Sequence, residues 1–297
     1  MARHAHFFLS RIIKLGKLDV HGVVDALQSS PSIQSRGFAW TVVDVTSGVT
    51  IHGGKEYRYI AGKLAKYDPD ALVEVIDATS RKVRLQSEPN LQRASSLFVY
   101  IPDEAVFGHR YLWNQLRAAD FRTQMKALVD EFHRGFFAEC ELQPIADLSR
   151  FLTKLTELDE ITDIKATVSP PNPLFGVYWQ NLKNYLQERR LQKMSIREAA
   201  KTGDVIASRT LDVARTIEGE SEENAVPAPI GDAAVLMAAD GYGRAEITGR
   251  RKTEVVVVKT AQNAVQLKLD ATVAPPELAA AVVREIVRIN GKRRLKH

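Results

Sequence analysis

The sequence is almost free of cysteine, because Cys140 is the only one among 297 residues. A single thiol can form neither an internal disulfide nor a thiolate cluster for zinc or iron–sulfur. We therefore expect a reducing environment, and cytoplasmic localisation fits it best. Glu139 and Glu141 flank the thiol and disfavour its ionisation, so we predict that Cys140 is buried filler and not a catalytic nucleophile.

Long hydrophobic runs are also lacking. Runs such as residues 255–258 and 278–283 are far shorter than the roughly 20 residues that cross a bilayer. The first residues are basic and then apolar, but Arg11 and Lys14 interrupt them before the core of a signal peptide could form. We expect no membrane among the partners of this protein.

Catalytic motifs are equally scarce. Gly53-Gly54-Lys55 lacks the spacing of a phosphate-binding loop and the Ser or Thr that follows its lysine, so it predicts a hairpin turn. There is no Gly-x-Ser-x-Gly nucleophile elbow. The sequence therefore predicts no catalytic residue and no cofactor.

A metal centre has only weak support. His4 and His6 would point to the same side of a strand, but terminal histidines are usually just exposed. Pro-Asp pairs at Asp70 and Asp103 could begin a nuclease site, yet neither is followed by the Glu-x-Lys that binds magnesium and orients water. A metal-dependent nuclease with His109 or Asp103 near the metal remains the third hypothesis, and no metal ligand is assigned.

What is present predicts a folded α+β chain. Apolar residues make up 45% and charged residues 26% of the sequence, as in ordinary globular proteins. Five or six extended segments in the first 105 residues predict a mainly antiparallel sheet, including a strand at 38–46 that ends at Ser47-Gly48 and a partner at 57–67. Helical periodicity follows at 111–116, 121–137 and 148–158.

The prolines that follow Ser169 predict a domain boundary, which gives one domain of residues 1–168 and another of residues 169–297. In the second, residues 178–200 predict the longest helix. Three extended segments at 244–248, 253–260 and 264–271 then predict a smaller sheet, backed by a terminal helix over 276–290.

Positive charge gathers at the end of the chain. Residues 241–297 carry twelve Lys and Arg against five Asp and Glu, whereas the remaining 240 residues carry 29 against 31. A basic turn and a basic tail would together present several cations to phosphates. The predicted nucleic-acid contacts are Arg250, Arg251, Lys252, Lys292, Arg293, Arg294 and Lys296.

Two stretches carry a resemblance. The segment PNLQRASSLFVYIPDEAVFGHRYLWNQ from Pro89 to Gln115 and the segment SPPNP beginning at Ser169 resemble patterns in bacterial proteins associated with anti-phage defence. The resemblance implies a bacterial cytosolic protein that acts near nucleic acid or inside a defence complex. It assigns no role to any residue.

Two main hypotheses follow. The first is a non-enzymatic protein that binds the phosphate backbone of DNA or RNA through its basic C-terminal region. The second is a protein-interaction subunit or homo-oligomer, because Trp113, Tyr178 and Trp179 have no catalytic constellation beside them.

Overall fold

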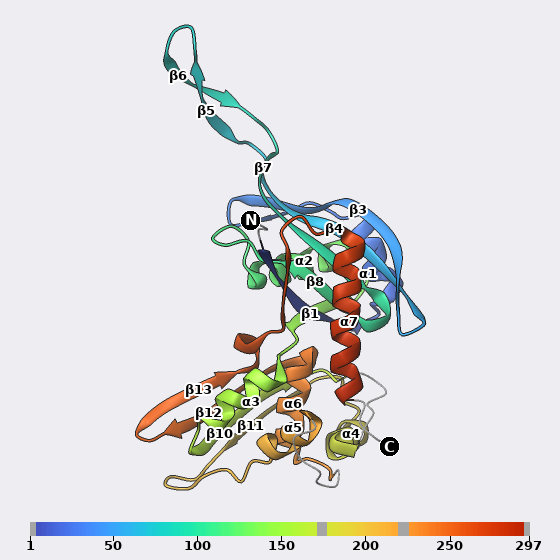
Figure 1. The fold of residues 1–297 in the computed structure, drawn as a ribbon, viewed down its shortest axis with the longest axis vertical. Helices are drawn as coiled ribbons and strands as arrows, with labels where there is room; N and C mark the ends of the chain where they lie inside the picture. The colour runs from blue at the N-terminus through green and yellow to red at the C-terminus, as the bar shows by residue number, and fades with distance from the viewer. Residues whose placement is uncertain (1–3, 171–176, 219–225, 294–297) are drawn as a thin grey trace. The chain divides into compact units, whose positions relative to one another are not determined.

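The computed structural model describes residues 4–170, 177–218 and 226–293. Its chain forms two compact units, shown in Figure 1. The first unit comprises residues 1–7, 14–141 and 268–280, and the second comprises residues 8–13, 142–267 and 281–297. The predicted α+β class is confirmed. The chain thus passes between the units several times, whereas the sequence predicted a single boundary near Ser169.

An antiparallel sheet dominates the first unit. It contains β2 (Ile33–Ser35), β3 (Phe38–His52), β4 (Lys55–Asp68), β7 (Leu91–Ile101) and β8 (Val106–Arg110). The order continues from β8 to β1 (His4–Gly16) and then β14 (Gln266–Asp270), while β9 (Ala138–Pro144) also pairs with β1. Strands β1, β9 and β14 contribute residues to both units.

Two helices complete the core of the first unit, namely α1 (Val20–Gln28) and α2 (Ala118–Phe132). Phe121 on α2 packs against Phe98 and Phe107, and all three side chains are fully buried. The predicted helix at 111–116 is wrong, because this segment forms a turn closed by a bridge between Leu112 and Leu116. It contains too few residues to nucleate a helix that packing does not support.

The strand expected to end at Gly48 continues to His52. Gly48 lies opposite Tyr59 in β4, and the Tyr59 ring occupies the space in which a Cβ atom on Gly48 would stand. Gly48 therefore allows the Tyr59 ring to pack closely against the strand, and it does not end the strand. The turn at Gly53 and Gly54 is confirmed, since both residues have positive φ between β3 and β4.

A two-stranded ribbon extends from the end of β4 and β7 (Figure 1). It consists of β5 (Leu72–Asp77) and β6 (Lys82–Ser87), which pair only with each other. We refer to residues 72–87 as the arm. Because a lone hairpin has few neighbours to bury its side chains, the arm keeps much apolar surface exposed.

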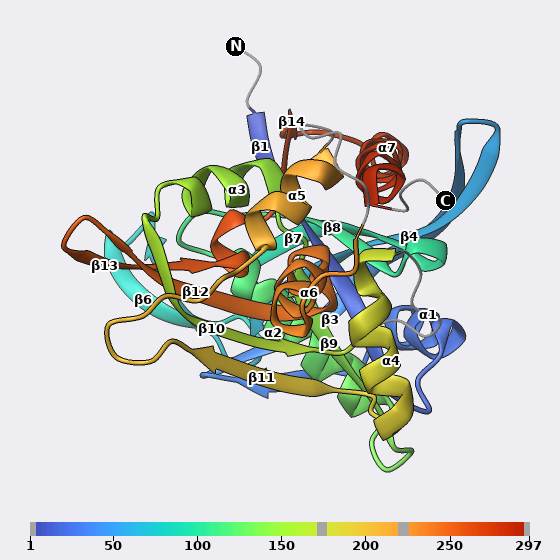
Figure 2. The same ribbon diagram turned by 90° about the horizontal axis from the view of Figure 1, so that it is seen from below.

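The second unit is a four-stranded antiparallel sheet with helices on one face. The strand order is β11 (Met194–Ala199), β10 (Glu160–Val168), β12 (Gly243–Arg251) and β13 (Glu254–Lys259). Figure 2 shows the helices of this unit in front of that sheet. They are α3 (Leu148–Thr156), α4 (Gln180–Arg189), α5 (Thr210–Glu218) and α6 (Ile230–Met237).

Alternation along the strands explains the two faces of this sheet. Ile164, Ala166, Ala245 and Ile247 are buried among the helices, while their neighbours in sequence point to the other side. Helix α7 (Pro275–Arg293) confirms the predicted terminal helix and contributes to both units. None of the helices in the described ranges is long and apolar enough to span a bilayer.

Two predictions about this region are wrong. The segment 178–200 is not one helix: α4 ends at Arg189, the next residue, Arg190, adopts a left-handed conformation with φ of 54°, and β11 begins at Met194. The third C-terminal strand, β14, pairs with β1 and does not join β12 and β13. The apolar residues of 178–200 fit helical spacing, but the alternation of residues 194–197 decides the structure.

The boundary predicted after Ser169 can be followed only in part. The backbone N–H of Ser169 donates to the carbonyl of Tyr242 at 2.8 Å, one residue beyond the pairing of β10 with β12. The chain is described as far as Pro170, whereas the further prolines of this segment, Pro171 and Pro173, lie outside the described residues. This hydrogen bond still ties Ser169 to the end of the sheet of the second unit.

Candidate nucleic-acid interface

The exposed face of the second unit's sheet carries cations from three neighbouring strands. Lys165 lies on β10, Arg197 on β11 and Arg244 on β12, and all three side chains are exposed. The strand register sets Lys165 directly opposite Arg197 on one side and opposite Glu246 on the other. We call this surface, together with Lys259 on β13, the cationic face.

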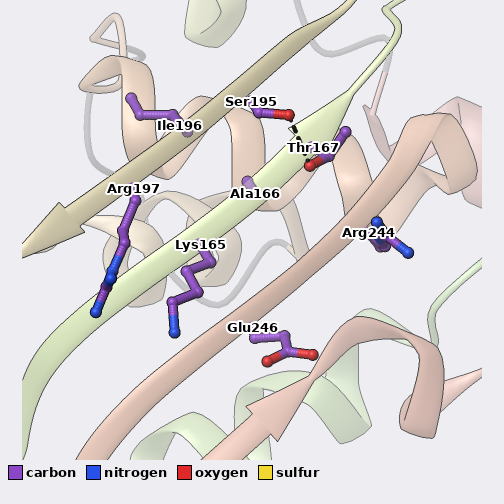
Figure 3. Close-up of a pocket in the computed structure, with 8 residues that line it drawn as sticks. All are labelled: Lys165, Ala166, Thr167, Ser195, Ile196, Arg197, Arg244 and Glu246. Atoms are coloured by element: carbon purple, nitrogen blue, oxygen red, sulfur yellow. Dashed lines mark hydrogen bonds between the residues drawn. The ribbon is translucent and has the colours of Figure 1, made fainter.

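A shallow cavity of about 430 Å³ opens on the cationic face. Figure 3 shows its lining residues, with Lys165, Arg197, Arg244 and Glu246 all below the Thr167–Ser195 pair in this view. The two hydroxyls of that pair lie 3.0 Å apart and are hydrogen-bonded. The cavity is lined by Lys165, Ala166, Thr167, Ser195, Ile196, Arg197, Arg244 and Glu246.

Two carboxylates partly balance these cations. Asp163 pairs with Arg197 at 2.9 Å and with Lys165 at 3.4 Å, and Glu246 pairs with Lys259 at 2.8 Å. Arg244 forms no ion pair with any described residue. Four cations against two carboxylates leave the cationic face with a net positive charge, and the guanidinium of Arg244 is the cation most open to a ligand.

The opposite side of the same sheet has different electrostatics. Glu198 on β11 faces the start of α6, and burial raises the pKa of its carboxyl, with a further contribution from nearby Asp232. Asp232 is buried and accepts hydrogen bonds from the hydroxyls of Ser208 and Thr210, both at 2.6 Å. Asp232 thereby holds the loop before α5 against α6, while Glu198 accepts a hydrogen bond from the backbone N–H of Gly231, so we assign both carboxyls a structural role.

The predicted basic turn lies at the far end of β12 and is neutralised by its surroundings. Arg250 pairs with Glu160 at 3.8 Å, and Arg251 pairs with Glu157 at 3.2 Å and with Glu254 at 3.4 Å. The backbone N–H of Lys252 donates to Asp159 at 2.6 Å. Three cations therefore stand among four carboxylates, although Arg250 shares the exposed side of β12 with Arg244 and Glu246.

The other half of the predicted interface is the C-terminal tail. Lys292 and Arg293 belong to the last turn of α7, and Arg294 and Lys296 lie outside the described residues. The tail contacts stay a prediction.

Sequence reasoning missed the cationic face because its members are far apart in the chain. Lys165, Arg197 and Arg244 come from three separate segments, and none of them lies in a dense basic run. A usable signal does exist in the strands: Lys165 and Arg244 each stand between two buried residues, and Ser195 and Arg197 alternate with Met194 and Ile196. Strand pairing is needed to bring those signals together.

The residues considered for a metal site do not gather. His4 and His6 are exposed on β1, while His109 is buried on β8, its ring stacked on Phe121 with centroids 4.0 Å apart. Burial holds the pKa of His109 well below its ordinary value, so the imidazole is neutral at pH 7. Within the described ranges, no three His, Cys, Asp or Glu side chains form a cluster suited to a metal ion.

Cys140 and two of the three aromatic residues proposed for a protein contact are buried. Cys140 is buried, and burial together with nearby Asp130 raises the pKa of its thiol well above the ordinary value. Trp113 is exposed, whereas Tyr178 and Trp179 are buried in the core of the second unit. Of the three aromatic residues proposed for a protein contact, only Trp113 is at the surface.

Comparison with known proteins supplies no family for this chain. No protein-family model matches the sequence, and no curated protein matches it either.

Proposed function

We propose that this protein binds nucleic acid through the phosphate backbone, with the cationic face as the centre of the interface. The observation that carries the proposal is the convergence of Lys165, Arg197 and Arg244 on one exposed sheet face. Adjacent strands lie about 4.8 Å apart and alternate residues along a strand about 6.7 Å apart. Cations at these spacings can bind one phosphate jointly or two phosphates separately.

The neutral groups of the cationic face support the same kind of ligand. The hydroxyls of Thr167 and Ser195 can donate to phosphate oxygens, as Ser and Thr often do at nucleic-acid interfaces. The eight residues that line the cavity include no aromatic side chain on which a base could stack. We therefore propose binding that depends little on base sequence and strongly on salt.

We include the basic turn and the tail in the proposed interface, but the proposal does not depend on them. Arg250 continues the exposed side of β12 beyond Arg244, and it can meet a phosphate once its ion pair with Glu160 opens. A role in bacterial anti-phage defence, which the resemblance of residues 89–115 implies, belongs to the proposal as well.

The test is a salt series of fluorescence anisotropy with labelled duplex DNA, single-stranded DNA and RNA. For the double variant Lys165→Gln/Arg244→Gln, we expect the slope of log affinity against log salt to fall by about 2 units on duplex DNA, because about two phosphate contacts are lost. The matched control is Arg58→Gln/Arg81→Gln, which removes two exposed cations from the first unit. Equal slopes for the two double variants would contradict the proposal.

A second candidate function is protein interaction through the arm. Leu72, Ile76, Val83 and Leu85 share one face of the ribbon and are each between 62% and 78% exposed. Apolar groups this exposed and this close together are typical of surfaces that bind another chain. Light scattering of the wild-type protein and of Ile76→Asp/Leu85→Asp tests this candidate, which fails if both are monomers and if both retain the same copurifying proteins.

A further inference from the structure

A second cavity, of about 450 Å³, lies within the first unit. It is formed where the β2–β3 hairpin and β4 meet the segment that leads into α2. Its size is that of a small-molecule pocket, and it shares no residue with the cationic face. The lining residues are Ser35, Arg36, Phe38, Trp40, Lys66, Asn114, Gln115, Arg117, Asp120 and Gln124.

The only carboxylate among these lining residues is already engaged. Asp120 accepts from Nε of Arg117 at 3.0 Å and from its second guanidinium nitrogen at 3.1 Å, and it also accepts the backbone N–H of Arg117 at 3.0 Å. The hydrogen bonds from Arg117 lower the pKa of Asp120, and the charge of Arg36 acts in the same direction. Asp120 is therefore ionised and holds Arg117 at the start of α2.

Two cations of the cavity remain without a carboxylate. The ammonium of Lys66 lies 3.8 Å from the ring centre of Phe38 and 5.7 Å from that of Trp40, so aromatic rings hold it in place. Neither Lys66 nor Arg36 forms an ion pair with a described residue. The cavity consequently keeps a surplus of positive charge beside an apolar wall.

Two buried neutral side chains lie beside these cations. The indole N–H of Trp40 is buried and has no hydrogen-bond partner in the described part of the chain, and the Trp40 side chain is 5% exposed. Gln124 is 7% exposed and donates from its amide nitrogen to the hydroxyl of Ser35 at 3.3 Å. The Trp40 N–H is buried too deeply to meet a molecule in the cavity, so Trp40 contributes its ring to the apolar wall and the Gln124 amide contributes a donor.

We propose that this cavity binds the phosphate monoester of a small organic molecule of about nucleoside size. Arg36 and Lys66 bind the phosphate dianion, and the organic part lies against Phe38, the Trp40 ring and the Gln124 amide. A guanidinium and an ammonium together match a group with several acceptor oxygens and two negative charges. The same chemistry is offered by a free nucleotide and by the terminal phosphate of a strand, so the experiment has an arm for each.

The first measurement is isothermal titration calorimetry with adenosine 5′-monophosphate, ribose 5-phosphate and inorganic phosphate, with adenosine as the probe that lacks phosphate. We expect saturable binding of the monophosphate, and affinity for adenosine that is weaker by at least about tenfold. Trp40 provides a second readout: ligand-induced quenching of fluorescence should persist in Trp113→Phe and disappear in Trp40→Phe.

Variants locate the binding. Arg36→Gln/Lys66→Gln should raise the dissociation constant by at least about tenfold, whereas Arg36→Lys, which keeps the charge, should change it by less than about threefold. Arg58→Gln removes an exposed cation of β4 outside the cavity and should have no effect. Thermal melts show that each variant is folded before its affinity is compared.

Two results would overturn the inference: no saturable binding of any phosphate probe up to about 10 mM, or equal binding by the wild type and Arg36→Gln/Lys66→Gln. A trinucleotide with a 5′-phosphate and one with a 5′-hydroxyl identify the source of the phosphate. Binding of the phosphorylated strand alone supports a strand end, and binding of adenosine 5′-monophosphate alone supports a free nucleotide.

Discussion

The basic turn and the cationic face differ in how their charges are balanced. The turn at Arg250–Lys252 is the denser cluster in the sequence, yet in space it stands among Glu157, Asp159, Glu160 and Glu254. The cationic face is inconspicuous in the sequence, yet strand pairing gives it more cations than carboxylates. A run of cations therefore predicts a binding surface only when its spatial neighbours are known.

Charge reversal separates the two surfaces most strongly. Lys165→Glu/Arg244→Glu should weaken binding to duplex DNA by about 100-fold at about 0.1 M salt, because it removes two phosphate contacts and adds two repulsive charges. Arg250→Glu/Arg251→Glu makes the same change in net charge and should weaken binding by less than about threefold. Anisotropy titrations measure both, and a larger loss from the turn variant would favour the interface predicted from the sequence.

Freeing cations on the cationic face should have a smaller, opposite effect. Asp163→Asn removes the carboxylate that pairs with Arg197 and Lys165. We expect about a threefold gain in affinity for duplex DNA, with a steeper salt dependence, because both cations become available to phosphates. An unchanged affinity would mean that neither cation contacts the ligand. Glu254→Gln, which releases one ion pair of Arg251, is the matched control at the turn.

The turn should matter for stability more than for binding. Arg251→Ala removes ion pairs to Glu157 and Glu254, with the Arg251 side chain about half exposed. Because solvent screens such pairs, we expect a loss of less than about 1 kcal/mol in the free energy of unfolding. Urea titration measures this loss, and DNA affinity measured in parallel should stay within about twofold.

On the helix-covered side of the sheet, Glu198 should make the stability of the protein depend on pH and should leave DNA binding unchanged. Burial raises the pKa of Glu198 in the folded protein, so its protonated form contributes stability that is present at acid pH and lost as pH rises through the folded pKa. Glu198→Gln should abolish this loss. The melting temperature of the variant relative to wild type should therefore be higher by about 1–2 °C at pH 7 than at pH 4.

DNA affinity at pH 7 serves as the control for this variant. Glu198 and Arg197 are adjacent in β11 but point to opposite sides of the sheet. A change in affinity of more than about twofold would show that the two sides are coupled.

Local signals were sufficient for much of the fold. Alternation and turn chemistry placed the β3–β4 hairpin with its Gly53-Gly54 turn, and β-branched runs placed β12 and β13. The segment 178–200 misled because Leu182, Leu186 and Met194 satisfy helical spacing, even though the chain changes to a strand after Arg190. Which strand pairs with which could not be predicted, since β14 is close to β13 in sequence and pairs with β1.

The candidate site was less predictable than the fold, for the same reason. The helical spacing of residues 178–200 places Arg197 in a helix, and that interpretation hides its alignment with Lys165. The cavity of the first unit combines residues from 35 to 124 that no short motif connects. Residue types indicate the chemistry of a site, but long-range register decides which residues share it.

The arm joins the rest of the first unit at a single point of the sheet. Asp68 and Leu91 close the ladder between β4 and β7, and the backbone N–H of Asn90 donates to Pro69 beyond that pair. Everything from Leu72 to Ser87 is therefore an excursion that begins and ends at one point of the sheet. Evolution can lengthen, shorten or exchange such an excursion while the sheet keeps its register, and a protein engineer can graft a foreign epitope or tag at the same place.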